Sequence, residues 1–173
     1  MRGSCSKLNN RYLETEAGEP FIRIGYAEQQ FILAEAVLRK WITGEGAEAY
    51  YRSGIRAAME FTAANTPVKY RHGVKIDDAY IASYLEGPQV KFGASAAENL
   101  NRIYKQKYML YFLQHEWDAF FECRRTGVPE LPVNPSTNMN TDPSKMPVRW
   151  MYPQTEYDRN NANVMEAIAR QYD

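Results

Sequence analysis

Histidine is the side chain best suited to acid–base chemistry near neutral pH, and this sequence has two, His72 and His115. Neither lies in a recognisable catalytic motif. His115 is followed by Glu116, as at the start of a zinc-protease helix, but the second histidine of such a site would fall on Ala119. Two zinc ligands therefore cannot share a helix face, and we predict no metal site and no cofactor.

A cysteine nucleophile needs a histidine beside it and a third group that orients the histidine. Cys123 follows His115 by eight residues, which places the two side chains about 80° apart on a helix, and we expect no Asn or Asp to orient the pair. Asp118 and Glu122 lie one helical turn apart, as carboxylates on solvated helix faces often do. We therefore predict a buried, unreactive Cys123 and no catalytic dyad, so the chain is not expected to be an enzyme.

Exposed aromatic rings beside hydrogen-bonding side chains form platforms on which sugar rings can stack. Trp150 and Tyr152 stand next to Arg149 in a proline-containing stretch, and Tyr70 precedes a basic pair that ends at His72. If this chain contacts a sugar, we expect the ligand-binding residues to be Tyr70, His72, Trp150 and Tyr152. The alternative is that Trp150 has no ligand and only packs the C-terminal region against the helices.

The amino-acid composition argues against two classes of protein, those that bind nucleic acids and those that span membranes. The 173 residues contain 21 Lys and Arg against 21 Asp and Glu, so no net positive charge attracts a nucleic acid backbone. Hydrophobic residues make up 45%, as in globular proteins, and the apolar run from Tyr108 to Leu113 is far too short to cross a bilayer. The first ten residues lack the apolar core of a secretory signal, so Cys5 is not expected to carry a lipid anchor.

Helical periodicity begins after a polar stretch, 1–20, which we predict to be a flexible loop or tail. In 21–42 apolar residues recur at spacings of three and four on two faces, which predicts one long helix that is buried on two sides. A glycine-containing turn follows, and 47–64 repeats the pattern with small residues that allow close approach of the first helix. The two segments predict an antiparallel, tetratricopeptide-like helical hairpin with Trp41 in its core.

Two further helix starts are marked by capping residues. Asp77 would cap a short helix, and Ser95 with Glu98 has the spacing of a capping box that starts a longer one. The longer helix is expected to bend or break near 114–115 and to end at 126–127. Arg124 and Arg125 form its last turn, where cations meet the negative end of the helix dipole, and a glycine follows.

The C-terminal region differs from the helical part in composition. After Pro129 the sequence is rich in Pro and Asn and lacks apolar periodicity until 163–171, where we predict one short closing helix. Trp117, which lies before this region, is assigned to the core. The predicted fold class is all-α, with tetratricopeptide-like helical hairpins and an irregular Pro/Asn-rich C-terminal region.

Several segments together resemble the SusD/RagB-like outer-membrane nutrient-binding lipoproteins. The similar segments are I-G-Y-A-E and L-A-E-A within 24–36, Y-Y-R-S-G-I-R at 50–56, I-Y-K-Q-K at 103–107, E-W at 116–117, R-R-T-G at 124–127 followed by Pro129, and the closing run at 146–160. This resemblance implies a C-terminal helical domain over 21–173 behind the flexible segment 1–20.

The resemblance further implies a protein at the outer membrane that captures an oligosaccharide or another nutrient and passes it to a TonB-dependent transporter of the SusC type. It implies binding and no catalysis. Family members are typically longer, so we expect this chain to be a C-terminal piece that is soluble by itself. The alternative function is a tetratricopeptide-like protein-interaction scaffold with no ligand site of its own.

The helix predicted over 21–42 has more apolar surface than the other predicted helices can cover. Large apolar side chains are unlikely to stay in water, since burial of each contributes about 1.5 to 3 kcal/mol. We therefore predict either self-association of the chain or a fold-back of residues 1–20 onto the uncovered face.

Overall fold

Helices make up all the regular secondary structure in the described part of the computed structural model, which covers residues 7–14, 20–115, 117–138, 142–146 and 150–171. The helices are α1 (Arg11–Glu14), α2 (Tyr26–Leu38), α3 (Ala47–Asn65), the 3₁₀ turn η1 (Val68–Tyr70), α4 (Asp78–Leu85), α5 (Ala96–Leu110), α6 (Asp118–Thr126) and α7 (Gln154–Gln171). The predicted all-α class is confirmed. Within these ranges, none of the helices has the length and apolar character needed to cross a membrane.

The chain divides into two compact units, Met1–Glu130 and Leu131–Asp173. The change in composition after Pro129 lies at this division, which falls within the predicted domain over 21–173. The first unit contains α1 to α6, and the second contains α7 and the irregular segment before it.

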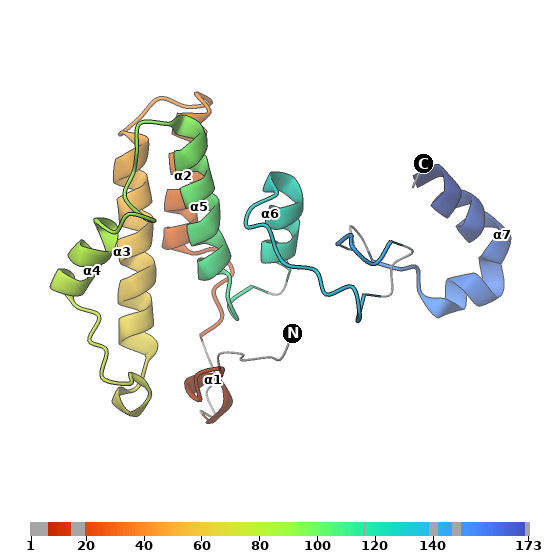
Figure 1. Cartoon of the computed structure of the whole chain (residues 1–173), viewed down its shortest axis with the longest axis horizontal. Coiled ribbons are helices and arrows are strands. Elements are labelled where there is room, and N and C mark those ends of the chain that lie inside the picture. Colours follow the sequence, from red (N-terminus) through yellow and green to blue (C-terminus); the bar gives the residue numbers. More distant parts are fainter. Residues whose placement is uncertain (1–6, 15–19, 116, 139–141, 147–149, 172–173) are drawn as a thin grey trace. The chain divides into compact units, whose positions relative to one another are not determined.

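The predicted hairpin is formed by α2 and α3, and α5 packs against both helices (Figure 1). The helices approach closely because Gly54 of α3 lies against the ring of Phe31: a Cβ atom at Gly54 would stand 2.7 Å from Phe31 Cε1. Phe31, Tyr51 and Ile55 are each 1% exposed, so this contact lies at the centre of the core. Gly54 is thus needed for the packing of the hairpin.

The first long helix is shorter than its periodicity indicated. It begins at Tyr26 and ends at Leu38, and Lys40 then adopts a left-handed conformation with a φ of 60°. Trp41 consequently lies in the turn and is 67% exposed, with the Arg39 guanidinium 5.3 Å from its ring centroid. The prediction that Trp41 belongs to the core was wrong, because the apolar stripe was extended past the end of the helix.

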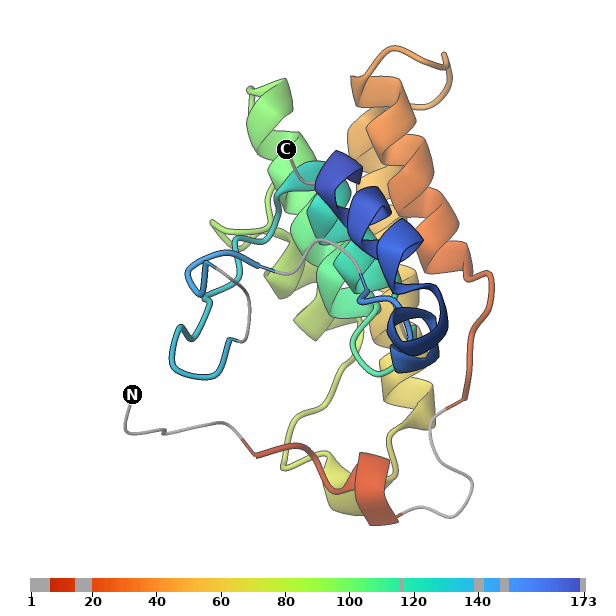
Figure 2. The same ribbon diagram turned by 90° about the vertical axis from the view of Figure 1, so that its right-hand side faces the viewer.

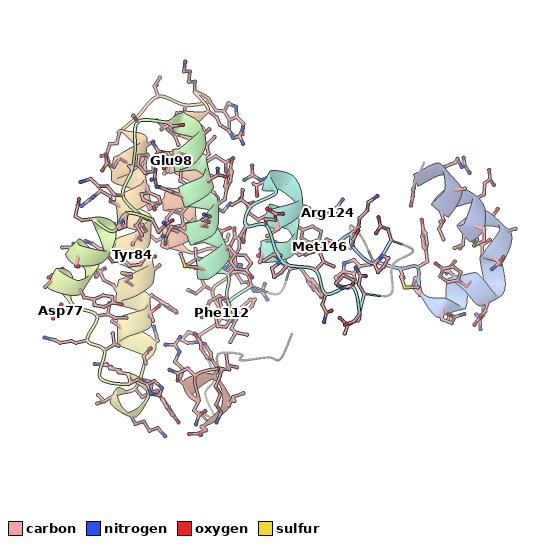
Figure 3. All side chains as sticks on the ribbon, viewed as in Figure 1. Asp77, Tyr84, Glu98, Phe112, Arg124 and Met146 are labelled. Carbon is pink, nitrogen blue, oxygen red and sulfur yellow. The ribbon has the colours of Figure 1, made fainter. Side chains whose placement is uncertain are left out.

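The capping residues stand where the sequence predicted them. Asp77 accepts a hydrogen bond from the Tyr80 backbone N–H at 3.0 Å at the start of α4. At the start of α5, Ser95 Oγ accepts one from the Glu98 backbone N–H at 3.4 Å (Figure 3, where Asp77 and Glu98 are labelled). Gly127 ends α6 with a φ of 70°, as a left-handed C-cap does.

The predicted break near residues 114–115 separates α5 from α6. Leu113, with a φ of 56°, turns the chain between them. Trp117 directly precedes α6 and is 47% exposed. The prediction that Trp117 belongs to the core was wrong, because this residue lies at a helix start and not on the buried face of a continuous helix.

Residues 9–14 fold back onto the end of α3 and onto η1. Arg11 is 6% exposed, and its guanidinium contacts the Thr66 hydroxyl. Asn9 Nδ2 donates a hydrogen bond to the Tyr70 carbonyl at 3.0 Å. A helical turn with a buried arginine therefore stands within the segment that was predicted to be a flexible tail. These contacts go to α3 and η1, whereas the predicted fold-back was onto the uncovered face of the helix over 21–42.

The second unit contains α7, which changes direction at Asn160 (Figure 2). The predicted helix over 163–171 matches the part after Asn160. The part before it was missed because its polar residues have no apolar periodicity. Upstream, Asn138 Nδ2 donates to the carbonyls of Pro143 and Lys145 at 2.9 and 2.7 Å, so side-chain hydrogen bonds organise the irregular segment.

Candidate functional site

Glu35 of α2 is the centre of a group of charged side chains that joins α2, α5 and α6. Its side chain is 6% exposed, and Arg125 of α6 donates to both of its carboxylate oxygens at 2.8 Å. Arg39 Nε and the Tyr104 hydroxyl donate to Oε1 at 2.8 and 2.9 Å. Burial by itself raises the pKa of Glu35, but the hydrogen bonds from Arg125, Arg39 and Tyr104 outweigh it and lower this pKa to about 2. Glu35 is therefore ionised at neutral pH.

Glu122 of α6 is the second carboxylate of the group. Its Oε1 accepts hydrogen bonds from Lys107 Nζ at 2.9 Å and from Arg125 Nη2 at 2.6 Å. Burial raises the pKa of Glu122, and the bonds from Arg125 and Lys107 lower it below its ordinary value. The expectation that Asp118 and Glu122 form a solvated pair was wrong for Glu122, whose side chain is 11% exposed. We call the following six residues the ion-pair cluster: Glu35, Arg39, Tyr104, Lys107, Glu122 and Arg125.

The ion-pair cluster stabilises the packing of α2, α5 and α6. Two carboxylates face three cationic side chains, and each of the six groups hydrogen-bonds to another member of the cluster. The sequence analysis assigned Arg125 to the helix dipole and missed its partner. The available signal was Lys107, a lysine within the apolar stripe of α5, because a buried ammonium requires a carboxylate nearby.

His115 has an acid beside it, which the sequence analysis did not expect. Its Nδ1 lies 2.7 Å from Asp118 Oδ2, and its ring centroid is 4.8 Å from that of Tyr111. Cys123 is half-buried, and burial followed by the charge of Glu122 raises the pKa of its thiol, which makes the thiolate scarce at neutral pH. In the part of the chain that the structure describes, no three His, Cys, Asp or Glu residues are grouped so that they could hold a metal ion.

Tyr70 and His72, two of the predicted sugar contacts, line one pocket of about 420 Å³ together with Arg71 and Lys75. Tyr70 is only 5% exposed, its hydroxyl donates to Glu14 Oε2 at 3.0 Å, and it therefore forms a wall of this pocket and not an open stacking platform. His72 is exposed in a tight turn, with a φ of 48°.

Trp150 and Tyr152, the other two predicted contacts, belong to the second unit. Trp150 is 56% exposed, so much of its ring is accessible within that unit. Tyr152 is half-buried, and its hydroxyl lies 3.5 Å from Gln171 Oε1 at the end of α7. The four predicted residues are thus distributed over two units, two in each.

An apolar pocket of about 330 Å³ was not predicted from the sequence. It opens beside α2, α3 and α5, and its lining includes Phe31, Phe61 and Met109. Tyr12 of α1 covers part of it by packing edge-on against Phe112, with ring centroids 6.1 Å apart. The pocket depends on residues far apart in the sequence, which periodicity cannot place together.

The family model for SusD-like proteins, described as starch-binding and associating with the outer membrane, matches residues 2–153. The chain belongs to the SusD-like family. No curated protein matches it.

Solved structures of SusD-like proteins share this fold. A SusD homolog from Bacteroides fragilis NCTC 9343 is 48% identical over 95% of this chain, with a TM-score of 0.81, and a second from the same strain is 42% identical over 89%, with a TM-score of 0.71. An outer-membrane protein of Bacteroides vulgatus ATCC 8482 named for nutrient binding is 37% identical over 94%, with a TM-score of 0.75. The matches cover 35%, 32% and 34% of those chains, so this SusD-like chain spans about a third of their length.

In this SusD-like chain, three of the segments that carry the family resemblance meet at the ion-pair cluster. L-A-E-A contains Glu35, I-Y-K-Q-K contains Tyr104 and Lys107, and R-R-T-G contains Arg125. Segments that lie 90 residues apart meet through the bidentate bond between Glu35 and Arg125. These three motifs therefore contribute to the packing of α2, α5 and α6.

Proposed function

We propose that this chain is part of a nutrient-binding protein of an outer-membrane uptake system and that its nutrient is an oligosaccharide. The observation that carries the proposal is the 48% identity and TM-score of 0.81 to a SusD homolog over 95% of the chain. The family description, starch-binding and associating with the outer membrane, supports a glycan over other nutrients. The role is binding and delivery, with a TonB-dependent transporter of the SusC type as the partner.

Within this chain we assign the sugar contact to the second unit. Trp150, with 56% of its surface exposed, offers an apolar ring on which the carbon face of a sugar can stack, and Tyr152 adds a hydroxyl nearby in sequence. In the first unit, His72 is accessible as a hydrogen-bonding group, and Tyr70 supports the pocket wall beside it.

Titration of the chain with maltooligosaccharides and a panel of other soluble glycans, followed by tryptophan fluorescence and calorimetry, tests this proposal. We expect Trp150→Ala to weaken binding by about tenfold or more, because a stacked ring is lost. Trp41→Ala is the matched control, since Trp41 is also exposed but lies in the turn after α2. Absence of binding to every glycan would refute the ligand class, and equal losses in the two variants would refute the assignment to Trp150.

The alternative is a protein-interaction scaffold, which the helical hairpin of α2 and α3 favours because stacked helix pairs commonly bind peptides. Co-purification with a SusC-type transporter, with and without glycan, separates the alternatives. Glycan delivery requires that the chain bind both a glycan and the transporter. A scaffold would bind the transporter but no glycan.

A further inference from the structure

The helix α6 is attached to its unit differently from the other long helices of that unit. None of its nine residues is buried, whereas α2, α3 and α5 each bury at least four. The apolar anchors of this part of the chain lie outside the helix: Tyr111, 4% exposed, precedes α6, and Val128, partly buried against the core, follows it. The apolar side chains of α6 are at most partly buried, as Ala119, Phe120 and Cys123 are, so apolar burial contributes less to the position of α6 than to that of α2, α3 or α5.

Ion pairs also attach α6 to α2 and α5. Arg125 reaches Glu35 of α2 with two hydrogen bonds of 2.8 Å, and Glu122 reaches Lys107 of α5 with one of 2.9 Å. The side chains of Glu35 and Lys107 are each 6% exposed. A buried ion that loses its partner is strongly destabilised, so Glu35 and Lys107 favour the state in which α6 is docked.

The backbone at the two ends of α6 makes it a separate element. Leu113 before the helix has a φ of 56°, and Gly127 after it has a φ of 70°. Left-handed residues interrupt helical hydrogen bonding, so α6 is not a continuation of α5 and can move without unwinding it.

We propose that α6 is a latch, a helix that the ion-pair cluster holds on α2 and α5 and that detaches as a unit while the core of α2, α3 and α5 stays folded. This inference goes beyond the proposed function and does not depend on it. A detached α6 would remain tethered at Val128, which packs against the core before the second unit begins at Leu131.

Hydrogen–deuterium exchange of the whole chain, followed by mass spectrometry, tests the latch. Arg125→Gln and Glu122→Gln each remove one charge from α6 and leave α2, α3 and α5 unchanged in sequence. Arg124→Gln is the matched control, because Arg124 neighbours Arg125 on α6 but packs over the Phe120 ring, with its guanidinium 5.9 Å from the ring centroid. We expect α6 amides to exchange about tenfold or more faster in the two cluster variants, with α3 amides unchanged and the control like the wild type.

Two results would overturn the proposal. In the first, α6 exchanges equally fast in Arg125→Gln, Arg124→Gln and the wild type, which means that the ion pairs do not hold it. In the second, α6 and α3 amides accelerate together in the cluster variants, which means that α6 unfolds only with the core and is not a separable element.

Discussion

At the scale of single residues, Glu35 shows how one buried side chain can organise several helices. Its carboxylate would be unfavourable in an apolar setting, yet it accepts hydrogen bonds from Arg39, the C-cap of α2, from Tyr104 of α5 and from Arg125 of α6. The bond from Arg39 is local, so the carboxylate is fully satisfied only when α5 and α6 are both packed against α2. The same residue therefore couples ionisation to tertiary structure.

This coupling makes stability depend on pH. The pKa of Glu35 is lowered from 4.5 to about 2 in the folded chain, so its ionised form stabilises the fold above pH 4.5, and the contribution is lost as the pH falls from 4.5 towards 2. We expect Glu35→Gln to lower the free energy of unfolding by roughly 3 kcal/mol at pH 7 and by much less near pH 2. Urea unfolding at a series of pH values measures the difference, with Glu45→Gln in an exposed turn as the control. A difference that stays constant with pH would contradict the role of ionisation.

At the scale of elements, the packing of α2 against α3 depends on close steric fit, whereas the ion-pair cluster depends on charge. The Phe31 ring fills the space that a side chain at Gly54 would occupy. Such a site has no spare volume, because protein cores are packed as densely as organic crystals.

Gly54→Ala tests this packing. Alanine favours helix by about 1 kcal/mol over glycine, but its Cβ would stand 2.7 Å from Phe31 Cε1. We expect the clash to prevail, with a net loss of about 1 to 2 kcal/mol in the free energy of unfolding. Ser53→Ala, at the adjacent half-buried position of the same helix, is the control and should be neutral or slightly stabilising. Stabilisation by Gly54→Ala would show that the two helices can move apart at no cost.

The helical turn α1 is attached through Arg11, whose buried guanidinium contacts Thr66 at the end of α3. We expect Arg11→Ala to lower the free energy of unfolding by about 1 to 3 kcal/mol, because the buried bond from the guanidinium to the Thr66 hydroxyl and the packing of the arginine stem are both lost, while the Thr66 hydroxyl still donates to the Thr62 carbonyl. Chemical denaturation measures the change. Arg23→Ala, in the exposed stretch before α2, should have no measurable effect. Equal stability of the two variants would mean that α1 does not contribute to the fold.

The elements also show which parts of the structure a sequence can predict. Local signals predicted the bounds of α3, the caps at Asp77 and Ser95 and the end of α6, because each depends on residues within one or two turns. Bonds between distant residues were not predictable: Arg125 was read as a dipole partner because nothing near it in the sequence points to Glu35, 90 residues away. Among the candidate ligand contacts, Tyr70 is buried and its hydroxyl donates to Glu14, which lies 56 residues before it, so its surroundings could not be predicted from nearby residues.

At the scale of the whole molecule, the described residues of the first unit leave an apolar area exposed near the start of α2 and the end of α5. Phe21, Phe112 and Leu113 line a hollow of about 540 Å³ and are 64%, 55% and 51% exposed. The fold-back of α1 covers only part of this area, through the contact between Tyr12 and Phe112. Large exposed apolar patches favour association in water.

We therefore expect this chain to self-associate in a concentration-dependent way, which sedimentation velocity over a range of concentrations will measure. Phe21→Ser should shift the distribution towards monomer, since it removes apolar area from the hollow. Val68→Ser is the control, because Val68 is 77% exposed on η1 and does not line this hollow. A monodisperse monomer at high concentration would contradict the prediction.

The rate at which the Cys123 thiol is chemically modified can measure how often α6 opens. Alkylating reagents react with the thiolate, and both its half-burial and its raised pKa slow that reaction at neutral pH. With Cys5 replaced by serine, the modification rate of the chain would report how often the Cys123 sulfur reaches water. The rate should rise with pH as the thiolate forms and should rise further in Arg125→Gln at a fixed pH. Half-burial and a raised pKa make the Cys123 thiol unsuited to nucleophilic catalysis. The same two properties make its modification rate sensitive to the opening of α6.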